Sequence, residues 1–294
     1  KARAQEQEAG HAALKQHPQI YMCPIKEPSF FAFEGSPLVF DGPPVKIVET
    51  TMTCAADYER LFEAATTQRI LGEASTAYMM WTCAMRTAAN IHLYLPRGRL
   101  IAILRHPVER AYSAFRFCLG RGFEPLADFA KALEEEQALR RENWHPGAHY
   151  LRNGLYYQCL KPYFEQFPRE QLRIYLYEDW NLQPAQTLRD IFQFLEVEDV
   201  LRPSMLKRHN VTYIPRSRAM DSFLKYPHWF KTLVGCFLPR SLRRALVTRA
   251  RAWNRVELPP LDPELRHRLT AAYREDILHL QDLTGRDLSH WLDE

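Results

Sequence analysis

The sequence predicts an α/β fold in which helices flank a central parallel sheet. Short strand-like runs alternate with longer helical patterns along the 294 residues, which is typical of such a sheet. The run 100–104, Leu-Ile-Ala-Ile-Leu, is apolar at every position, as expected for a strand covered on both faces. Pro107 then suits a first helical position, because its missing N–H costs nothing there. A buried strand therefore leads directly into a helix.

Four runs are expected to form the strands of the sheet. They are residues 46–49, 69–73, 100–104 and 172–177. The last reads Leu-Arg-Ile-Tyr-Leu-Tyr and stops at Glu178 and Asp179. Helical patterns fall between these runs, so we expect the strands to lie parallel.

The helices are expected at the segments with helical spacing of apolar residues. Besides the helix that Pro107 opens, they are 57–66, 125–143, 154–167, 184–195 and 263–283. The last has the clearest boundaries, since Asp262 can cap its start and Gly285 follows its end. The Pro-rich segment 34–44 and the segment 210–218 are expected to be long loops, which are often functional.

Length and composition favour one elaborated domain over residues 1–294. A chain with 46% hydrophobic and 12% aromatic residues can bury one large core. No run approaches the roughly 20 apolar residues that span a bilayer, and the polar N-terminus does not resemble a signal peptide. We therefore expect a cytoplasmic protein.

The cysteines and the net charge exclude several classes of protein. The six cysteines are widely scattered without a Cys-x-x-Cys pair, which argues against a zinc site and a disulfide framework. The formal net charge of +4 favours anionic ligands without indicating a nucleic-acid binder. The oligomeric state cannot be read from the sequence.

The junction at 105–113 has the features of an anion site. Arg105 lies at the carboxyl end of the predicted strand, and Arg110 and Ser113 are three residues apart on the following helix. Guanidinium, hydroxyl and helix N-terminus could together bind a phosphate.

Several motifs in order give the chain a family resemblance. They are His17-Pro-Gln-Ile-Tyr21, Pro24-Ile-Lys-Glu-Pro-Ser-Phe-Phe31, Gly72-Glu-Ala-Ser-Thr-Ala-Tyr78, Leu104-Arg-His-Pro-Val-Glu-Arg-Ala-Tyr-Ser113, Gly154-Leu-Tyr-Tyr157, Tyr175-Leu-Tyr-Glu-Asp179, His209-Asn-Val211 and Asp287-Leu-Ser-His-Trp-Leu292. The chain resembles the sulfotransferases that use 3′-phosphoadenosine 5′-phosphosulfate (PAPS), particularly the bacterial members related to heparan sulfate sulfotransferases. The resemblance covers nearly the whole chain and implies a P-loop nucleotide-hydrolase-like sulfotransferase fold.

The resemblance also implies roles for single residues. Arg105 and Ser113 correspond to the pair that binds the 3′-phosphate of the nucleotide. Glu27 corresponds to the catalytic base, which takes the proton of an acceptor hydroxyl as the O–S bond forms. Lys26 would stabilise the transferring sulfuryl group. Each has a plainer alternative: Arg105 and Ser113 as solvated surface residues, and Glu27 as a loop glutamate paired with Lys26.

By the same resemblance, the basic loop 207–218 lies in the region where the family's proteins close over the nucleotide. Arg216 and Arg218 are therefore expected to contact a phosphate. The alternative is that this segment is a solvated basic loop. The implied donor is PAPS, and the acceptor is a small molecule or glycan bearing a hydroxyl or amine. The proposed sulfuryl transfer needs no metal.

One family motif is not recognisable. The family opens with a strand and a Lys-x-Gly-Thr-Thr loop that cradles the 5′-phosphosulfate, and this loop is expected near residues 4–8. Those positions read Ala-Gln-Glu-Gln-Glu, with no glycine for close backbone approach and two carboxylates that repel an anion. The sequence therefore leaves two alternatives open, which are a catalytically impaired binding or scaffold protein and another phosphate-handling enzyme such as a kinase.

Overall fold

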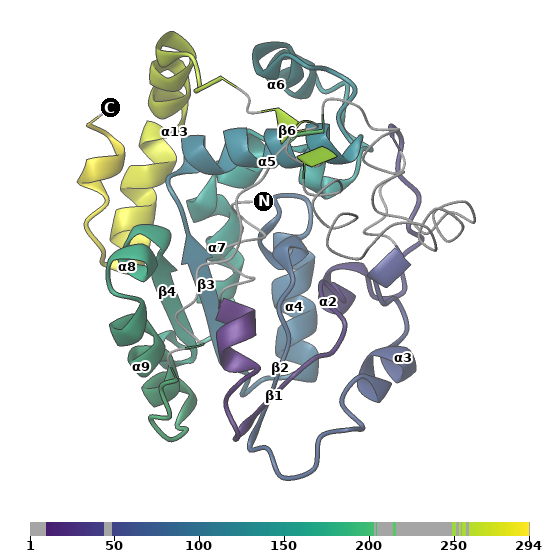
Figure 1. Cartoon of the computed structure of the whole chain (residues 1–294), viewed down its shortest axis with the longest axis vertical. Helices are drawn as coiled ribbons and strands as arrows, with labels where there is room; N and C mark the ends of the chain where they lie inside the picture. The colour runs from purple at the N-terminus through teal and green to yellow at the C-terminus, as the bar shows by residue number, and fades with distance from the viewer. Residues whose placement is uncertain are drawn as a thin grey trace.

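The computed structural model describes residues 10–43, 49–202, 204, 214–215, 249–250, 253, 255–256 and 259–293. It confirms the α/β class, with helices packed around parallel strands (Figure 1). Residues 1–9, most of the segment 46–49 and most of 205–248 lie outside the described residues. Of the expected loop at 210–218 only Ile214 and Pro215 are described, and they form a short strand instead of a loop.

The parallel strands form two pairs. β1 (Ile20–Met22) pairs with β2 (Ile70–Gly72), and β3 (Leu100–Leu104) pairs with β4 (Leu172–Leu176). In the described part of the chain these pairs are separate sheets, whereas the sequence predicted one continuous sheet. A short antiparallel pair, β5 (Ile214–Pro215) with β6 (Arg255–Val256), is also present.

The predicted strands agree with the structure except at the beginning of the chain. β3 has the predicted bounds, β2 lies within 69–73, and β4 ends one residue before 177. β1 was missed, because its three residues are too few for a recognisable pattern. Of the predicted strand 46–49 only Glu49 is described, and it is not in a strand.

The helices have these bounds: α2 (Phe30–Phe33), α3 (Ala55–Arg60), α4 (Ala84–Tyr94), α5 (Pro107–Arg121), α6 (Phe129–Gln137), α7 (Tyr156–Gln166), α8 (Tyr177–Leu182), α9 (Pro184–Leu195) and α13 (Pro263–Thr284). Short 3₁₀ turns are η2 (Thr76–Met79), η3 (Pro146–Ala148), η4 (Arg152–Gly154), η5 (Arg169–Gln171) and η7 (Ser289–Trp291). α9 has the predicted bounds and α13 is one residue longer than predicted. The prediction of one helix over 125–143 was wrong at both ends, because Asp128 caps α6 and the helix ends before Ala138.

Local signals fix the start and end of α5. His106 is its N-cap, and its Nδ1 accepts a hydrogen bond from the Val108 N–H at 3.3 Å. Pro107 occupies the first turn as expected. Gly122 ends the helix in the left-handed conformation, with φ of 84°. The strand-to-helix junction is therefore closely determined by the sequence.

The pair β3 and β4 is covered by apolar clusters on both faces. Leu100, Ala102 and Leu104 belong to a cluster that includes residues of α4, α5, α7 and α13. Ile101 and Ile103 belong to a second cluster, which includes residues of α9 and β1. This alternation is the two-sided burial that the apolar run 100–104 predicted.

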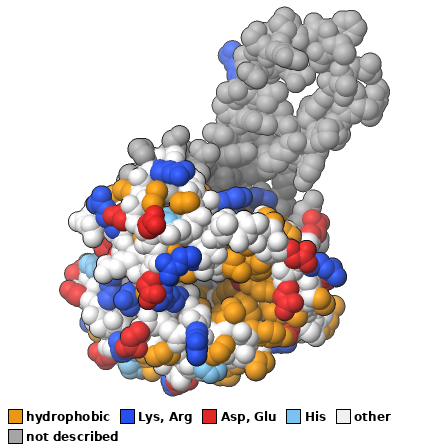
Figure 2. Space-filling view, turned by 90° about the horizontal axis from the view of Figure 1, so that it is seen from below, with side chains coloured by type: hydrophobic (Ala, Val, Ile, Leu, Met, Phe, Trp, Pro, Cys, Tyr) orange, Lys and Arg blue, Asp and Glu red, His pale blue; other side chains and the backbone are white. Residues whose placement is uncertain are grey.

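The surface includes exposed apolar side chains. Seen from below, they gather in a hollow bordered by polar residues (Figure 2). Leu71 of β2 and Leu93 and Leu95 at the end of α4 are among the exposed large apolar residues. In the part of the chain that the structure describes, no helix is both long and apolar enough to cross a bilayer.

Candidate active site

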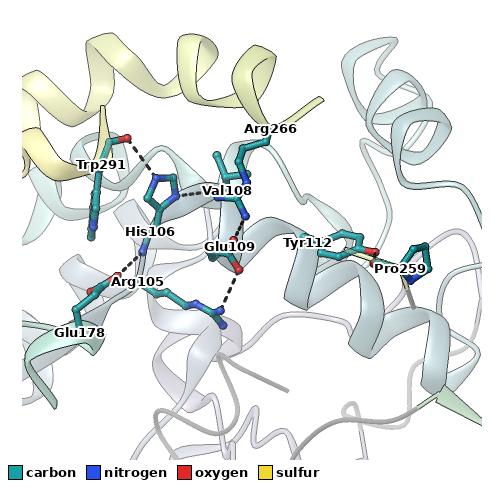
Figure 3. Close-up of polar contacts among 9 residues, drawn as sticks. All are labelled: Arg105, His106, Val108, Glu109, Tyr112, Glu178, Pro259, Arg266 and Trp291. Carbon is teal, nitrogen blue, oxygen red and sulfur yellow. Dashed lines mark hydrogen bonds and ion pairs between the residues drawn. The ribbon is translucent and has the colours of Figure 1, made fainter. Parts of the chain in front are cut away.

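The junction between β3 and α5 holds a row of alternating charges (Figure 3). Arg105 follows β3 directly, and its Nη2 lies 3.1 Å from Glu109 Oε2. The other carboxylate oxygen of Glu109 is ion-paired with Arg266 of α13. Burial opposes ionisation of Glu109, but the hydrogen bond from Arg266 and the charges of both arginines outweigh it and hold the pKa of this carboxyl below its usual range. Two guanidinium groups therefore converge on one anion.

The backbone at this junction is fixed from three sides. Tyr156 of α7 donates a hydrogen bond to the Arg105 carbonyl oxygen at 3.0 Å. The His106 N–H donates to Glu178 Oε1 of α8 at 3.4 Å, and the His106 ring contacts the Trp291 carbonyl oxygen at 3.2 Å. Arg105 is thus held at the carboxyl end of β3 with part of its side chain exposed.

The two other candidate residues on α5 differ in burial. Ser113 is half-buried. Arg110 lies in the core, fully buried, and donates to the Tyr150 carbonyl oxygen. The guanidinium that the sequence offered for phosphate binding at this junction is therefore Arg105, and not Arg110.

A second group of polar residues follows the first pair of strands. Glu27 lies in the loop after β1, and its Oε2 accepts hydrogen bonds from the Thr76 N–H at 2.6 Å and from Thr76 Oγ1 at 2.9 Å. The Ser29 N–H donates to Ser75 Oγ at 2.9 Å. Lys26 lies beside Glu27 in the same loop. The loop after β1 is thus docked on the loop after β2.

Both groups lie where parallel strands end. Residues 26–29 follow β1, residues 73–76 follow β2, and Arg105 follows β3. Ligands of open α/β sheets bind at the carboxyl ends of the strands. Arg216 and Arg218 lie outside the described residues, as do residues 4–8.

Sequence reasoning gave no role in these groups to Glu109, Arg266 or Glu73. Glu109 could have been found, because it stands four residues after Arg105 in a predicted helix. Arg266 is 157 positions from Glu109, so no local pattern connects them.

The comparisons with known proteins point to sulfotransferases. Residues 73–211 match the sulfotransferase domain model. A crystal structure of a sulfotransferase from Alicyclobacillus acidocaldarius aligns over 98% of this chain and 95% of its own, with a TM-score of 0.73 and 28% identity. The chain thus resembles sulfotransferases in sequence over residues 73–211 and in fold over nearly its whole length.

Two curated sulfotransferases also resemble this chain. The membrane-associated sulfotransferase kil1 of Dictyostelium discoideum is 30% identical in an alignment that covers 57% of this chain and 52% of that protein. Carbohydrate sulfotransferase 15 of Mus musculus is 25% identical in an alignment that covers 63% of this chain and 40% of that protein. The chain spans about half of the length of kil1 and a smaller share of the length of carbohydrate sulfotransferase 15.

Proposed function

We propose that this sulfotransferase moves a sulfuryl group from PAPS to a hydroxyl or amine of an acceptor, with a carbohydrate as one candidate. The observation that carries the proposal is Arg105, a partly exposed guanidinium held between the end of β3 and the start of α5. A helix N-terminus and a guanidinium together favour a phosphate.

The reaction is a direct in-line displacement. The acceptor oxygen forms a bond to sulfur while the bond from sulfur to the bridging oxygen of the phosphosulfate breaks. The leaving group is 3′-phosphoadenosine 5′-phosphate (PAP), which keeps the electron pair of the broken bond. Glu27 takes the acceptor proton, and Lys26 stabilises the charge that develops on the transferring group.

The 3′-phosphate would be bound by Arg105 and Ser113, which separates PAPS from nucleotides without that phosphate. The partial exposure of the Arg105 side chain supports this assignment, because a phosphate can approach the guanidinium from outside. Arg216 and Arg218 are proposed to contact the nucleotide as well. Carbohydrate sulfotransferase 15, by its name, supports a carbohydrate acceptor.

Residues 4–8 favour a second candidate function. Ala-Gln-Glu-Gln-Glu offers no glycine and brings two carboxylates to the expected position of the phosphosulfate cradle. A chain with this segment could bind the nucleotide weakly without turnover and serve as a binding or scaffold protein.

The domain organisation and location are also proposals. We infer one domain over residues 1–294, which the alignment over 98% of the chain supports. A cytoplasmic location stays a prediction, since one relative is membrane-associated by name.

Calorimetric titration of the chain with PAP and with AMP tests the donor. We expect micromolar binding of PAP, and at least tenfold weaker binding of AMP, because a charge-assisted hydrogen bond contributes about 1.5–3 kcal/mol. Arg105→Ala should lose this preference.

Arg99→Ala is the matched control for this titration. Arg99 immediately precedes β3 at the opposite end of the strand and is likewise ion-paired with a glutamate, Glu196. It should leave PAP binding unchanged. Equal affinity of the parent chain for PAP and AMP would contradict the donor assignment, and PAP binding without turnover would favour the scaffold function.

A further inference from the structure

Glu73 is a carboxylate at the candidate site to which the proposed reaction assigns no role. It follows β2 directly and belongs to the motif Gly-Glu-Ala-Ser-Thr-Ala-Tyr at 72–78. Tyr78 donates a hydrogen bond to its Oε1, and Ser75 Oγ donates to its Oε2 at 2.9 Å. Both oxygens of Glu73 therefore accept from hydroxyl groups of the same segment.

These two hydroxyl groups in turn hold the loop that carries Glu27. Ser75 Oγ accepts from the Ser29 N–H at 2.9 Å, and Tyr78 Oη accepts from the Phe31 N–H at 3.5 Å. A hydroxyl that accepts such a bond must direct its own proton elsewhere, and in both cases this proton goes to Glu73. Glu73 is thus the common acceptor behind two contacts to the loop.

The loop needs such support because its backbone is strained. Glu27 has φ of 57° and Ser29 has φ of 51°, which is the left-handed region that favours glycine. Residues in this region keep their conformation only where the surrounding structure over-determines it. In this conformation the carboxylate of Glu27 reaches the Thr76 N–H and hydroxyl.

We propose that Glu73 is a positioning residue, which acts through Ser75 and Tyr78 to hold residues 27–31 in the turn that aims Glu27. The inference rests on the proposed role of Glu27 as the base. Glu73 would then be a second carboxylate at the site, which positions the loop, whereas Glu27 takes the acceptor proton.

The charge of Glu73 also bears on Glu27. Desolvation raises the pKa of Glu73, hydrogen bonds from Tyr78 and Ser75 lower it, and the charge of Glu27 raises it again, to about 7. Glu73 therefore changes charge near neutral pH. Because the two carboxylates interact, their protons come off in steps that belong to the pair.

Other titratable groups that interact with Glu73 come from several elements of the described structure. They include Cys23 just after β1, Tyr58 of α3, Tyr78 of η2 and Tyr163 of α7. All are acids whose pKa is raised, so they stay neutral near pH 7. In that range the charge on Glu73 varies while these four groups do not change theirs.

Two variants test the positioning role, with one matched control. Glu73→Gln keeps the side-chain volume but loses the charge and one acceptor oxygen. Ser75→Ala leaves Glu73 in place and breaks the connection to the Ser29 N–H. The control is Glu136→Gln, since Glu136 is also a buried glutamate that accepts two bonds, from the N–H groups of Leu151 and Arg152 at 2.8 and 2.9 Å.

Amide hydrogen exchange gives the first readout, and it does not depend on activity. Both variants should exchange the amides of residues 27–31 about fivefold faster, as expected for the loss of one net hydrogen bond. Glu136→Gln should instead accelerate exchange at 151–152. Unchanged exchange at 27–31 in both variants would overturn the proposal, whether or not the chain turns over.

The pH dependence of kcat gives the second readout, which a merely structural role would not move. The parent enzyme should show a step in kcat near pH 7. In Glu73→Gln this step should be absent and kcat should be about tenfold lower, with the affinity for PAP unchanged. A parental pH profile in Glu73→Gln would overturn the positioning role. Absence of turnover in the parent chain would contradict the proposed function, and the exchange data would then decide the proposal alone.

Discussion

Arg105, just before α5, and Glu109, in its first turn, form an ion pair, with Arg105 Nη2 3.1 Å from Glu109 Oε2. The carboxylate lies between Arg105 and Arg266 and is ion-paired with both guanidinium groups (Figure 3). A phosphate arriving at Arg105 would meet a negative charge already in place. The site thus holds its own anion, and a nucleotide would have to compete with it.

Glu109→Gln should therefore tighten the binding of PAP. The expected gain is up to about fivefold, because a partly exposed ion pair contributes about 0.2–1 kcal/mol. Calorimetric titration measures it, with AMP affinity expected to stay constant. Glu142→Gln, which removes the partner of Arg152 in another partly exposed ion pair, is the control. Weaker PAP binding in Glu109→Gln would mean that Glu109 orients Arg105 instead of competing for it.

Glu27→Gln should abolish most of the sulfuryl transfer without weakening PAP binding. Glutamine keeps an oxygen that can accept the bonds from Thr76, but it cannot take the acceptor proton. General-base catalysis contributes about 10²–10⁴-fold, so kcat should fall by that amount. The exposed Glu63→Gln is the control. A loss smaller than tenfold would show that another group accepts the proton.

His149→Phe should make the fold less sensitive to acid. Burial lowers the pKa of His145 and His149 to about 4, whereas histidine in an unfolded chain titrates near 6.5. Between these values the unfolded state binds more protons, so stability falls as the pH drops from 6.5 to 4. Neither ring nitrogen of His149 has a hydrogen-bond partner among the described residues, so a phenyl ring loses no such bond.

Urea unfolding at pH 7.5 and at pH 5 measures the effect. At pH 5 the variant should avoid a loss of about 2 kcal/mol that the parent chain suffers through His149. His145→Phe is the contrast, because the His145 Nδ1 accepts from the Gly147 N–H at 3.1 Å and this bond would be lost at both pH values. Equal acid sensitivity of His149→Phe and the parent would contradict the expectation.

Arg141→Met should be among the most destabilising single substitutions. Arg141 and Glu124 form a buried pair with N–O distances of 2.6 and 3.1 Å, and Tyr150 also donates to Glu124. Removing the arginine leaves a buried, uncompensated carboxylate, which costs about 3–5 kcal/mol. Chemical denaturation of the double variant Arg141→Met/Glu124→Gln should recover much of this loss. The neighbouring exposed Arg140→Met should cost less than about 1 kcal/mol.

The elements that the sequence predicted well are those with local start and stop signals. α9 begins at Pro184, and α13 lies between the cap Asp262 and the left-handed Gly285. α4 was missed because its N-cap, Cys83, makes no side-chain capping bond. β1 is a strand through its pairing with β2, whose register joins Ile20 to Ile70, and no local pattern contains that information.

The residues of the candidate site also fall into those that a local sequence pattern locates and those that depend on contacts between distant segments. Arg105 could be located because one continuous segment contains the strand, the arginine and the helix start. Glu27 could be named only through a family motif, since its hydrogen bonds go to Thr76, 49 positions away. The supporting role inferred for Glu73 depends on two loops meeting, so it could not be found before the loops were placed.

The left-handed turn at Glu27 and Ser29 also creates a trade-off between the thermal stability of the protein and its turnover. Glycine adopts such φ values without steric cost, so Ser29→Gly would relieve backbone strain and could raise the melting temperature of the protein. The same change would free the turn to sample other conformations, in which Glu27 no longer points the same way. Thermostabilising screens of this chain would therefore tend to select slower enzymes at this turn, and a stabilised variant should be checked for turnover before it is adopted.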